Sequence, residues 1–164
     1  MKKLIKTLFD FKALFMILAI CLSSCSIPQN PKTQSMYAND ILNELIVAME
    51  SDDSESIKMM FSENVRKSPE LEDQIQEMLD YFEGEVAEFD EVKDCSGDES
   101  IRNGEIEYSH ITNAQCNKIV TDKYTYMLSF AYYIVDESKS DEGMHRIWIG
   151  KSEDDYLIVG NKKG

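Results

Sequence analysis

Four cysteines are the residues whose chemistry the sequence constrains most closely, and they lie at positions 21, 25, 95 and 116 of the 164-residue chain. A cysteine can bind a metal, act as a nucleophile or pair in a disulfide. Neither Cys95 nor Cys116 has an adjacent His or a repeated C-x-x-C partner, so zinc and redox-motif sites receive little support. The motifs of P-loops, dinucleotide-binding loops, zinc proteases and serine hydrolases do not occur.

Carboxylates in the middle of the chain have part of the spacing of a calcium loop. Loop positions 1, 3, 5, 8 and 12 are matched by Asp94, Ser96, Asp98, Ile101 and Glu105. However, Glu99 stands where such a loop needs glycine. The acidic clusters at 52–55 and 153–155 are typical of solvated turns. We therefore predict no metal site and no cofactor.

The first 24 residues differ from the rest of the chain in composition. Four lysines and one aspartate precede an apolar run from Ala13 to Leu22. Ten residues of helix span about 15 Å, half of a hydrocarbon core of about 30 Å, so the run is too short for a stable membrane anchor. We predict that residues 1–24 are a signal peptide that is cut off.

The end of this segment has the form of a lipobox, since Leu22, Ser23 and Ser24 precede Cys25. It resembles bacterial lipoprotein precursors, in which the cysteine receives a diacylglyceryl thioether and becomes the new N-terminus. We predict that Cys25 is lipidated and that its acyl chains hold the protein at the extracytoplasmic face of the cell membrane. Residues 25–36 would be a flexible tether. An ordinary secretory signal is the alternative.

Cys95 and Cys116 are the cysteines left in the mature domain. In an oxidising compartment a disulfide between them is permitted. Against it, a simple hairpin turning near residues 98–103 would set Cys95 opposite about residue 105, far from Cys116. The sequence leaves this pairing open.

The charge excludes one class of partner. The whole chain carries a formal charge of −14, and because residues 1–24 hold four Lys and one Asp, the chain from Cys25 onward carries −17. Nucleic acid is bound through clustered Lys and Arg, so we expect no nucleic-acid partner. The same charge repels an anionic membrane surface, so attachment would depend on the acyl chains and the tether.

The first half of the folded part has helical periodicity. One apolar face is predicted for a first helix, formed by Ile41, Leu42, Leu45, Ile46 and Met49. After polar residues 51–54, a short second helix would carry Ile57, Met60 and Phe61 inward. The third helix would have Ser68 as its N-cap, Pro69 at its first position and Gly84 as its stop. Its apolar stripe comprises Leu71, Ile75, Met78, Leu79 and Phe82.

From Glu85 onward the period changes toward two, which indicates strands. Alternation runs through 105–110 and 124–135, and shorter runs follow at 144–150 and 156–160. Residues 124–135 are apolar on both faces, as expected of a central strand that is covered on both sides. Short polar turns join antiparallel strands. We therefore predict an α+β fold, in which N-terminal helices pack on a curved antiparallel sheet, as one domain over residues 37–164.

This order of elements resembles the cone-shaped, cystatin-like roll of the nuclear transport factor 2 superfamily. More narrowly, the chain resembles small bacterial lipoproteins of the family called domain of unknown function 5104. The resemblance covers about residues 38–160 and rests on the lipobox, on residues 56–62 before the proline-started helix, and on the closing run 143–149. It implies a fold and a lipoprotein setting, with no established activity.

The superfamily resemblance also implies where chemistry would lie. Enzymes of this type place an Asp or His base and a Tyr or Asp donor at the mouth of the cone. The catalytic candidates are therefore His110, Asp90 and Tyr126. Further candidates are Tyr108 and Tyr132, and a rim site at His145, Arg146 and Trp148. The simpler interpretation is a solvated strand histidine and tyrosines packed in the sheet.

Without a strong catalytic motif, the sequence favours a non-enzymatic binding module. It would hold a small ligand, a cell-envelope component or another exported protein. The alternative is a cone-pocket enzyme that uses acid and base catalysis, such as an isomerase, dehydratase or hydrolase. A deep pocket with His110 or a carboxylate at its floor and a tyrosine hydroxyl nearby would favour the enzyme, and an interior filled by Phe61, Phe82 and tyrosine side chains would exclude it. A third hypothesis is a dimer formed through the exposed sheet.

Overall fold

The structure is a computed structural model that describes residues 33–160. The predicted signal peptide, Cys25 and most of the predicted tether lie outside the described residues. The first described helix, α2 (Gln34–Glu50), is capped by the Thr33 hydroxyl, which accepts a hydrogen bond from the Met36 amide at 3.3 Å. The last three residues of the predicted tether are therefore helical.

Three further helices follow: α3 (Ser54–Met60), α4 (Glu63–Arg66) and α5 (Leu71–Tyr81). The predicted second helix is α3, which ends at Met60 because Phe61 takes an extended conformation and forms a β-bridge with Met144, and the short α4 that follows was not predicted. The third helix begins later than predicted: Ser68 and Pro69 form a turn, in which the Ser68 carbonyl accepts from the Leu71 amide. The predicted apolar stripes of α2 and α5 are both buried, as predicted.

The second half of the chain is one antiparallel sheet of six strands. They are β1 (Val86–Phe89), β2 (Asp94–Arg102), β3 (Glu105–Thr121), β4 (Thr125–Val135), β5 (Gly143–Gly150) and β6 (Tyr156–Gly160). A short 3-10 helix, η1 (Lys139–Asp141), precedes β5. The order is β1-β3-β4-β5-β6, and β2 pairs with the same edge of β3 as β1 does, farther along the strand.

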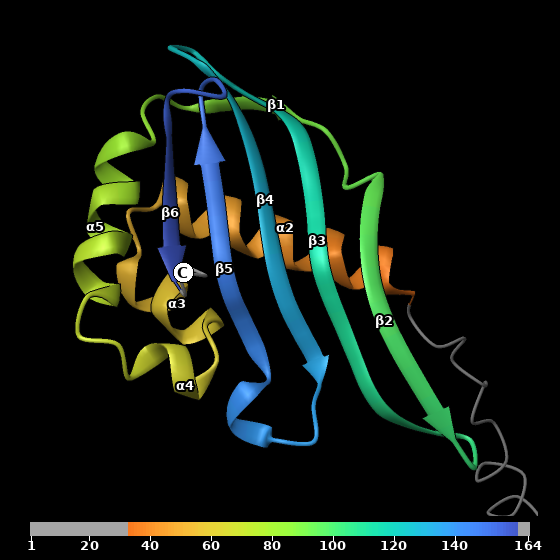
Figure 1. Cartoon of the computed structure of the whole chain (residues 1–164). Helices are drawn as coiled ribbons and strands as arrows, with labels where there is room; N and C mark the ends of the chain where they lie inside the picture. Colours follow the sequence, from red (N-terminus) through yellow and green to blue (C-terminus); the bar gives the residue numbers. More distant parts are fainter. Residues whose placement is uncertain (1–32, 161–164) are drawn as a thin grey trace, which may run out of the picture. The chain divides into compact units, whose positions relative to one another are not determined.

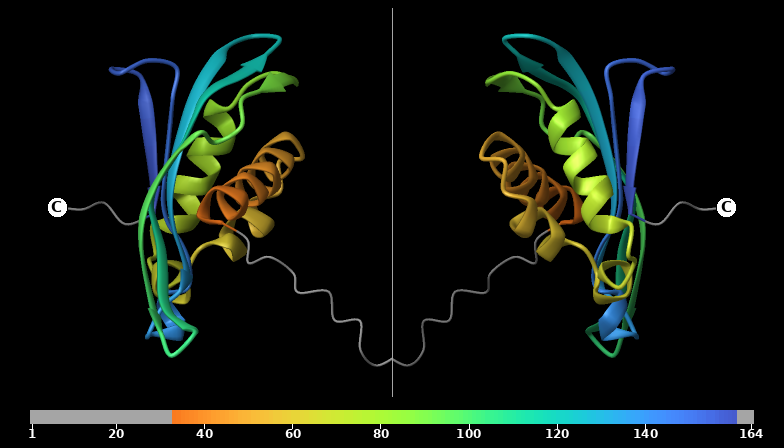
Figure 2. Two further views of the ribbon diagram at one scale, coloured as in Figure 1. Left: turned by 90° about the vertical axis from the view of Figure 1, so that its right-hand side faces the viewer. Right: turned by 90° about the vertical axis from the view of Figure 1, so that its left-hand side faces the viewer.

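The helices lie on one face of the curved sheet (Figure 1 and Figure 2). Helix α2 contacts β2 and β3, and α5 contacts β6. The core between the layers includes Phe61 from the bridge after α3, Ile75 from α5 and Phe130 from β4. This arrangement confirms the predicted α+β fold.

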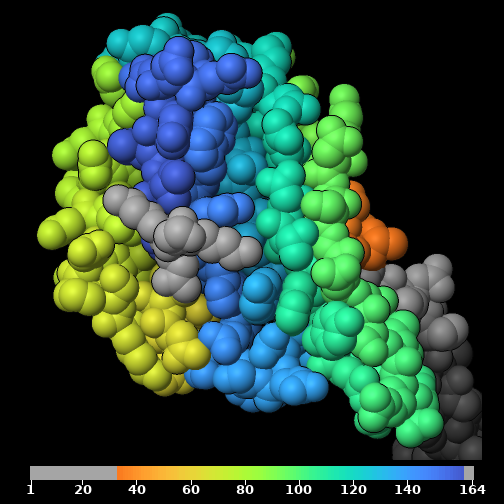
Figure 3. All heavy atoms as spheres, in the orientation of Figure 1, coloured from red at the N-terminus to blue at the C-terminus, as the bar shows by residue number. Residues whose placement is uncertain are grey.

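The opposite face of the sheet, which we call the outer face, is built by strands β2 to β6 side by side (Figure 3). Helices cover only one face of β4, whereas its sequence predicted cover on both. On the outer face Met127, Ala131 and Tyr133 are half-buried by their own neighbours. The residues described here include no helix that is long and apolar enough to cross a membrane.

Candidate functional site

Large side chains fill the space between helices and sheet. Phe61, Phe82 and Tyr126 are all buried there. The Tyr126 hydroxyl donates to the Tyr81 carbonyl at 3.1 Å and accepts from the Glu83 amide at 2.8 Å, and burial raises its pKa. This predicted catalytic candidate therefore fastens β4 to the end of α5.

His110, a second candidate, lies on the outer face of the sheet. Its Nε2 atom is 2.6 Å from Asp136 Oδ2. Its ring stacks on Tyr133, with centroids 3.9 Å apart, and Tyr133 packs in turn on His145 at 3.9 Å. Because both faces of the Tyr133 ring are covered, this row of rings, completed by Tyr108 beside His110, packs on itself and offers no open aromatic platform.

The residues of the predicted rim site also contact different neighbours. His145 is held through its Nε2 atom, 2.7 Å from the Asp141 carbonyl oxygen. Trp148 stacks instead on Tyr156 across β5 and β6, with ring centroids 5.6 Å apart. The rings of His145 and Trp148 therefore each pack on a neighbouring tyrosine of the sheet, Tyr133 and Tyr156 respectively.

Asp90, the third candidate, follows the end of β1 directly. Its amide donates to the Lys118 carbonyl at 2.9 Å, which places it beside the far part of β3. Eight residues of strand separate Lys118 from His110, a distance of about 26 Å. The structure therefore does not bring His110, Asp90 and Tyr126 together.

Cys95 and Cys116 are free thiols in the structure. The hairpin turns at Asn103 and Gly104, later than expected, so Cys95 pairs with Ala114 and not with residue 105. The buried Cys116 thiol donates to the Asp90 carbonyl at 3.2 Å. Burial raises the pKa of both thiols, which lowers their reactivity as nucleophiles. Their pairing in the cell stays a prediction.

The residues that match part of the spacing of a calcium loop lie mainly on an extended strand, because Asp94–Arg102 is β2. Within residues 33–160 no cluster of three or more His, Cys, Asp or Glu side chains has the geometry of a metal site.

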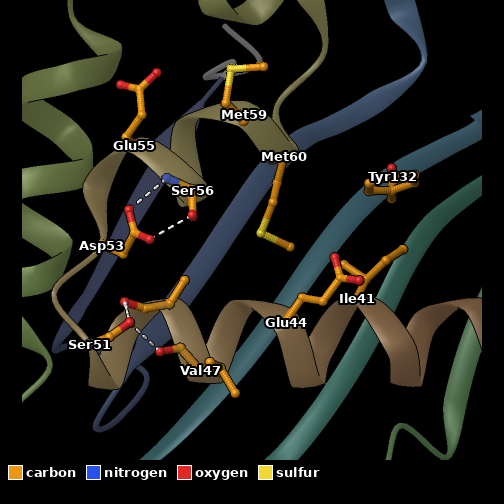
Figure 4. Close-up of a pocket in the computed structure, with 11 residues that line it drawn as sticks. Ile41, Glu44, Val47, Ser51, Asp53, Glu55, Ser56, Met59, Met60 and Tyr132 are labelled. Atoms are coloured by element: carbon orange, nitrogen blue, oxygen red, sulfur yellow. Dashed lines mark hydrogen bonds between the residues drawn. The ribbon is translucent and has the colours of Figure 1, made fainter.

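An open groove of about 600 Å³ lies between α2 and α3 and ends at β4 (Figure 4). Its α2 wall is one face of that helix, comprising Ile41, Glu44, Val47, Ala48 and Ser51. Its α3 wall comprises Asp53, Glu55, Ser56, Met59 and Met60. Tyr132 of β4 completes the lining. We call this feature the α2–α3 groove.

The α2–α3 groove combines exposed apolar side chains with carboxylates. Val47 and Met59 are 64% and 58% exposed, although both are large and apolar. Glu44, Asp53 and Glu55 are the charged groups of its lining as described, and none of the lining residues is Lys or Arg.

Two ionisable groups of the groove have shifted pKa values. The Ser56 hydroxyl and amide donate to Asp53, at 2.6 and 2.9 Å, and hold the pKa of this carboxyl below its usual range. Asp53 therefore stays ionised while it caps α3. Burial, reinforced by the charges of Glu44 and Glu142, raises the pKa of Tyr132 and keeps its hydroxyl neutral.

A smaller hollow of about 320 Å³ lies on the other side of α3, against α5. Glu55 lines both hollows. In this smaller hollow Lys58 pairs with Glu72, so the lining carries one cation against two carboxylates. The lining of the α2–α3 groove carries three carboxylates and no cation.

The α2–α3 groove was not predicted, although the sequence contains a signal for it. Val47 and Met59 are apolar residues that fall outside the core-facing stripes of their helices. An isolated exposed apolar side chain is ordinary on a protein surface, so only the packing of two helices shows that these residues line one groove.

Comparison with known proteins identifies a family for this chain. The family described as Domain of unknown function (DUF5104) matches residues 44–153, which include α3 to α5 and strands β1 to β5 but not β6. Among curated proteins, none matches the chain. Because the family match spans well over half of its length, the chain belongs to the DUF5104 family.

Proposed function

We propose that this protein is a lipid-anchored binding module of the cell envelope. In this proposal Cys25 carries the acyl chains, and the folded domain stands at the extracytoplasmic face of the cell membrane. The protein performs no reaction of its own and holds a ligand or an exported protein at the membrane.

The observation that carries the proposal is the α2–α3 groove. Val47 and Met59 expose apolar surface beside Tyr132 in a hollow large enough for a ligand. An exposed apolar groove with a charged margin is typical of surfaces that bind a partner.

The catalytic alternative has weaker support. His110 lies on the outer face, apart from Asp90 and Tyr126, and none of the three lines the α2–α3 groove or the hollow beside α5. An acid–base mechanism that combines a base with a separate proton donor needs both groups within reach of one substrate. The His110–Asp136 pair is accounted for by its packing with Tyr133.

Lipidation is tested by growing cells with radiolabelled palmitate. We expect the parent protein to take up label and the Cys25→Ala variant to take up none. An unlabelled parent would contradict the predicted anchor without bearing on the groove.

The groove is tested by photo-crosslinking of the full chain in the cell that makes it. A photoreactive amino acid replaces Val47 or Met59 in the groove, or Met36, which is 53% exposed on the same helix but outside the groove. We expect discrete adducts from positions 47 and 59 and none from position 36. Equal labelling at all three positions, or none, would overturn the proposed function.

A further inference from the structure

The shape of the α2–α3 groove narrows the class of its occupant. Its α2 wall runs from Ile41 to Ser51, which is about 15 Å of helix. Small-molecule pockets usually enclose most of their ligand, whereas here Val47 and Met59 stay largely open to solvent. A long open groove between two helices suits an extended partner, above all a helix of about three turns.

The apolar part of the lining is suited to a helix face. Met59 and Met60 are unbranched and flexible, so they can adapt to different apolar side chains. Opposite them, Ile41 and Val47 lie six positions apart on α2, which is less than two turns. Apolar side chains spaced by three or four residues on a bound helix would meet both walls.

The charged residues of the lining indicate the sign of the charge that a partner would carry. Glu44, Asp53 and Glu55 stand at the margin of the groove without a Lys or Arg in the lining. None of the three forms an ion pair in the described structure. Complementary charge favours Lys or Arg on the partner and disfavours anionic lipid or nucleic acid.

The same charges disfavour a second copy of this chain as the occupant. The two longest helices within residues 33–160, α2 and α5, contain no Lys or Arg, and α5 carries acidic residues in its first turn. Inserting either helix would bring carboxylates against Glu44 and Glu55. The charges of α2 and α5 therefore favour an occupant from another protein.

We propose that the α2–α3 groove binds a Lys- or Arg-bearing amphipathic helix of another exported protein. This inference rests on the proposed function, and it adds the chemical class of the partner. The apolar face of the helix would lie on Val47, Met59 and Tyr132, and its cationic residues would pair with Glu44 and Glu55.

The test uses the full-length processed chain in phosphatidylcholine nanodiscs, with empty nanodiscs as the blank. The probe is a fluorescent 14-residue helical peptide with Leu on one face and Lys along its flanks. A matched peptide has Gln in place of every Lys. We expect fluorescence anisotropy to show binding of the Lys peptide that is at least about 10-fold tighter than that of the Gln peptide.

Protein variants locate the binding. The double variant Glu44→Gln/Glu55→Gln should bind the Lys peptide about 3- to 10-fold more weakly than the parent, since each exposed ion pair contributes modestly to binding. The control Glu77→Gln/Glu137→Gln changes two exposed carboxylates outside the groove, so it removes the same charge and should bind like the parent. Val47→Ser should weaken the binding of both peptides, whereas Met36→Ser should leave the binding of both unchanged.

The outcomes separate this inference from the proposed function. Equal binding of the two peptides, or equal losses in the two carboxylate double variants, would overturn the cationic helix and leave the groove as a binding site. Groove adducts that prove to be a small molecule or a lipid would also overturn the cationic helix and leave the groove as a binding site. Failure of every peptide together with an absence of groove adducts would overturn both.

Discussion

His110 Nε2 lies 2.6 Å from Asp136 Oδ2 on the outer face of the sheet, while the helices and their groove occupy the other face. The same carboxylate accepts a second hydrogen bond from the Ser138 amide at 2.8 Å. Asp136 therefore ties β3 to the loop that follows β4, and it orients the ring that stacks on Tyr133. These contacts give His110 a structural role.

Replacement of Asp136 by asparagine tests this role. The carbonyl oxygen of the new side chain could still accept from the Ser138 amide, but the charge that faces His110 would be lost. We expect Asp136→Asn to lower the free energy of unfolding by about 1–2 kcal/mol, because a hydrogen bond to a charged group is lost from a half-buried position. Urea unfolding followed by circular dichroism measures the change.

The neighbouring residue supplies the control. Glu137→Gln removes one negative charge from an exposed position and should leave the free energy of unfolding within about 0.5 kcal/mol of the parent. If both variants unfold at the same urea concentration as the parent, the His110–Asp136 contact does not stabilise the fold.

The helical half of the chain was predictable because its periodicity reports burial directly. Leu45 of α2 and Ile75 of α5 lie in the core as their spacing indicates. Helix starts were less predictable: Ser68 and Pro69 have the residue types of a helix start, but α5 begins at Leu71 after a turn. Local residue preferences identify a helix end only within a few residues.

The candidate site was not predictable, because distant residues decide it. The alternation that places His110 on a strand does not say which face of the sheet the helices will cover. The hairpin turn was also misplaced, although Asn103 and Gly104 form the dipeptide that favours a tight turn, and both have positive φ. That displacement of the turn changes the partner of Cys95.

The thiols offer a direct check of this register. With Cys95 and Cys116 both free, we expect two thiols to react with Ellman's reagent in unfolded, unreduced protein whose Cys25 is lipidated. In the folded protein Cys95 should react faster than Cys116, because Cys116 is fully buried. Absence of any reactive thiol before reduction would instead indicate a disulfide between them.

Alkaline pH tests the contacts at the end of α5. The Tyr81 hydroxyl donates to the Asp155 carbonyl at 2.8 Å and accepts from the Lys151 amide at 3.0 Å. Burial raises the pKa of Tyr81 to about 12, against about 10 in an unfolded chain. The folded state therefore favours the neutral phenol, and its stabilising contribution is complete below about pH 10 and lost as pH rises toward 12.

The Tyr81→Phe variant isolates this contribution. It should be less stable than the parent at pH 8, since it lacks the two hydrogen bonds of the hydroxyl. Its free energy of unfolding should also fall less between pH 9 and pH 11.5 than that of the parent. Urea unfolding at several pH values measures both effects. An identical fall in the two proteins would show that Tyr81 does not couple stability to alkaline pH.

Two glycines of the β2–β3 hairpin distinguish backbone crowding from backbone conformation. A Cβ atom at Gly97 would lie 2.1 Å from the His110 carbonyl oxygen, so Gly97→Ala must push β2 away from β3. At Gly104 a Cβ atom meets nothing within 4 Å, but φ is +85°. We expect Gly97→Ala to lower the free energy of unfolding by about 2–3 kcal/mol and Gly104→Ala to lower it by about 1 kcal/mol, as measured by urea unfolding. The crowding at Gly97 involves main-chain atoms of β3, which cannot rotate away as a side chain could. If Gly104→Ala proved more destabilising than Gly97→Ala, β2 would lie farther from the His110 main chain than described.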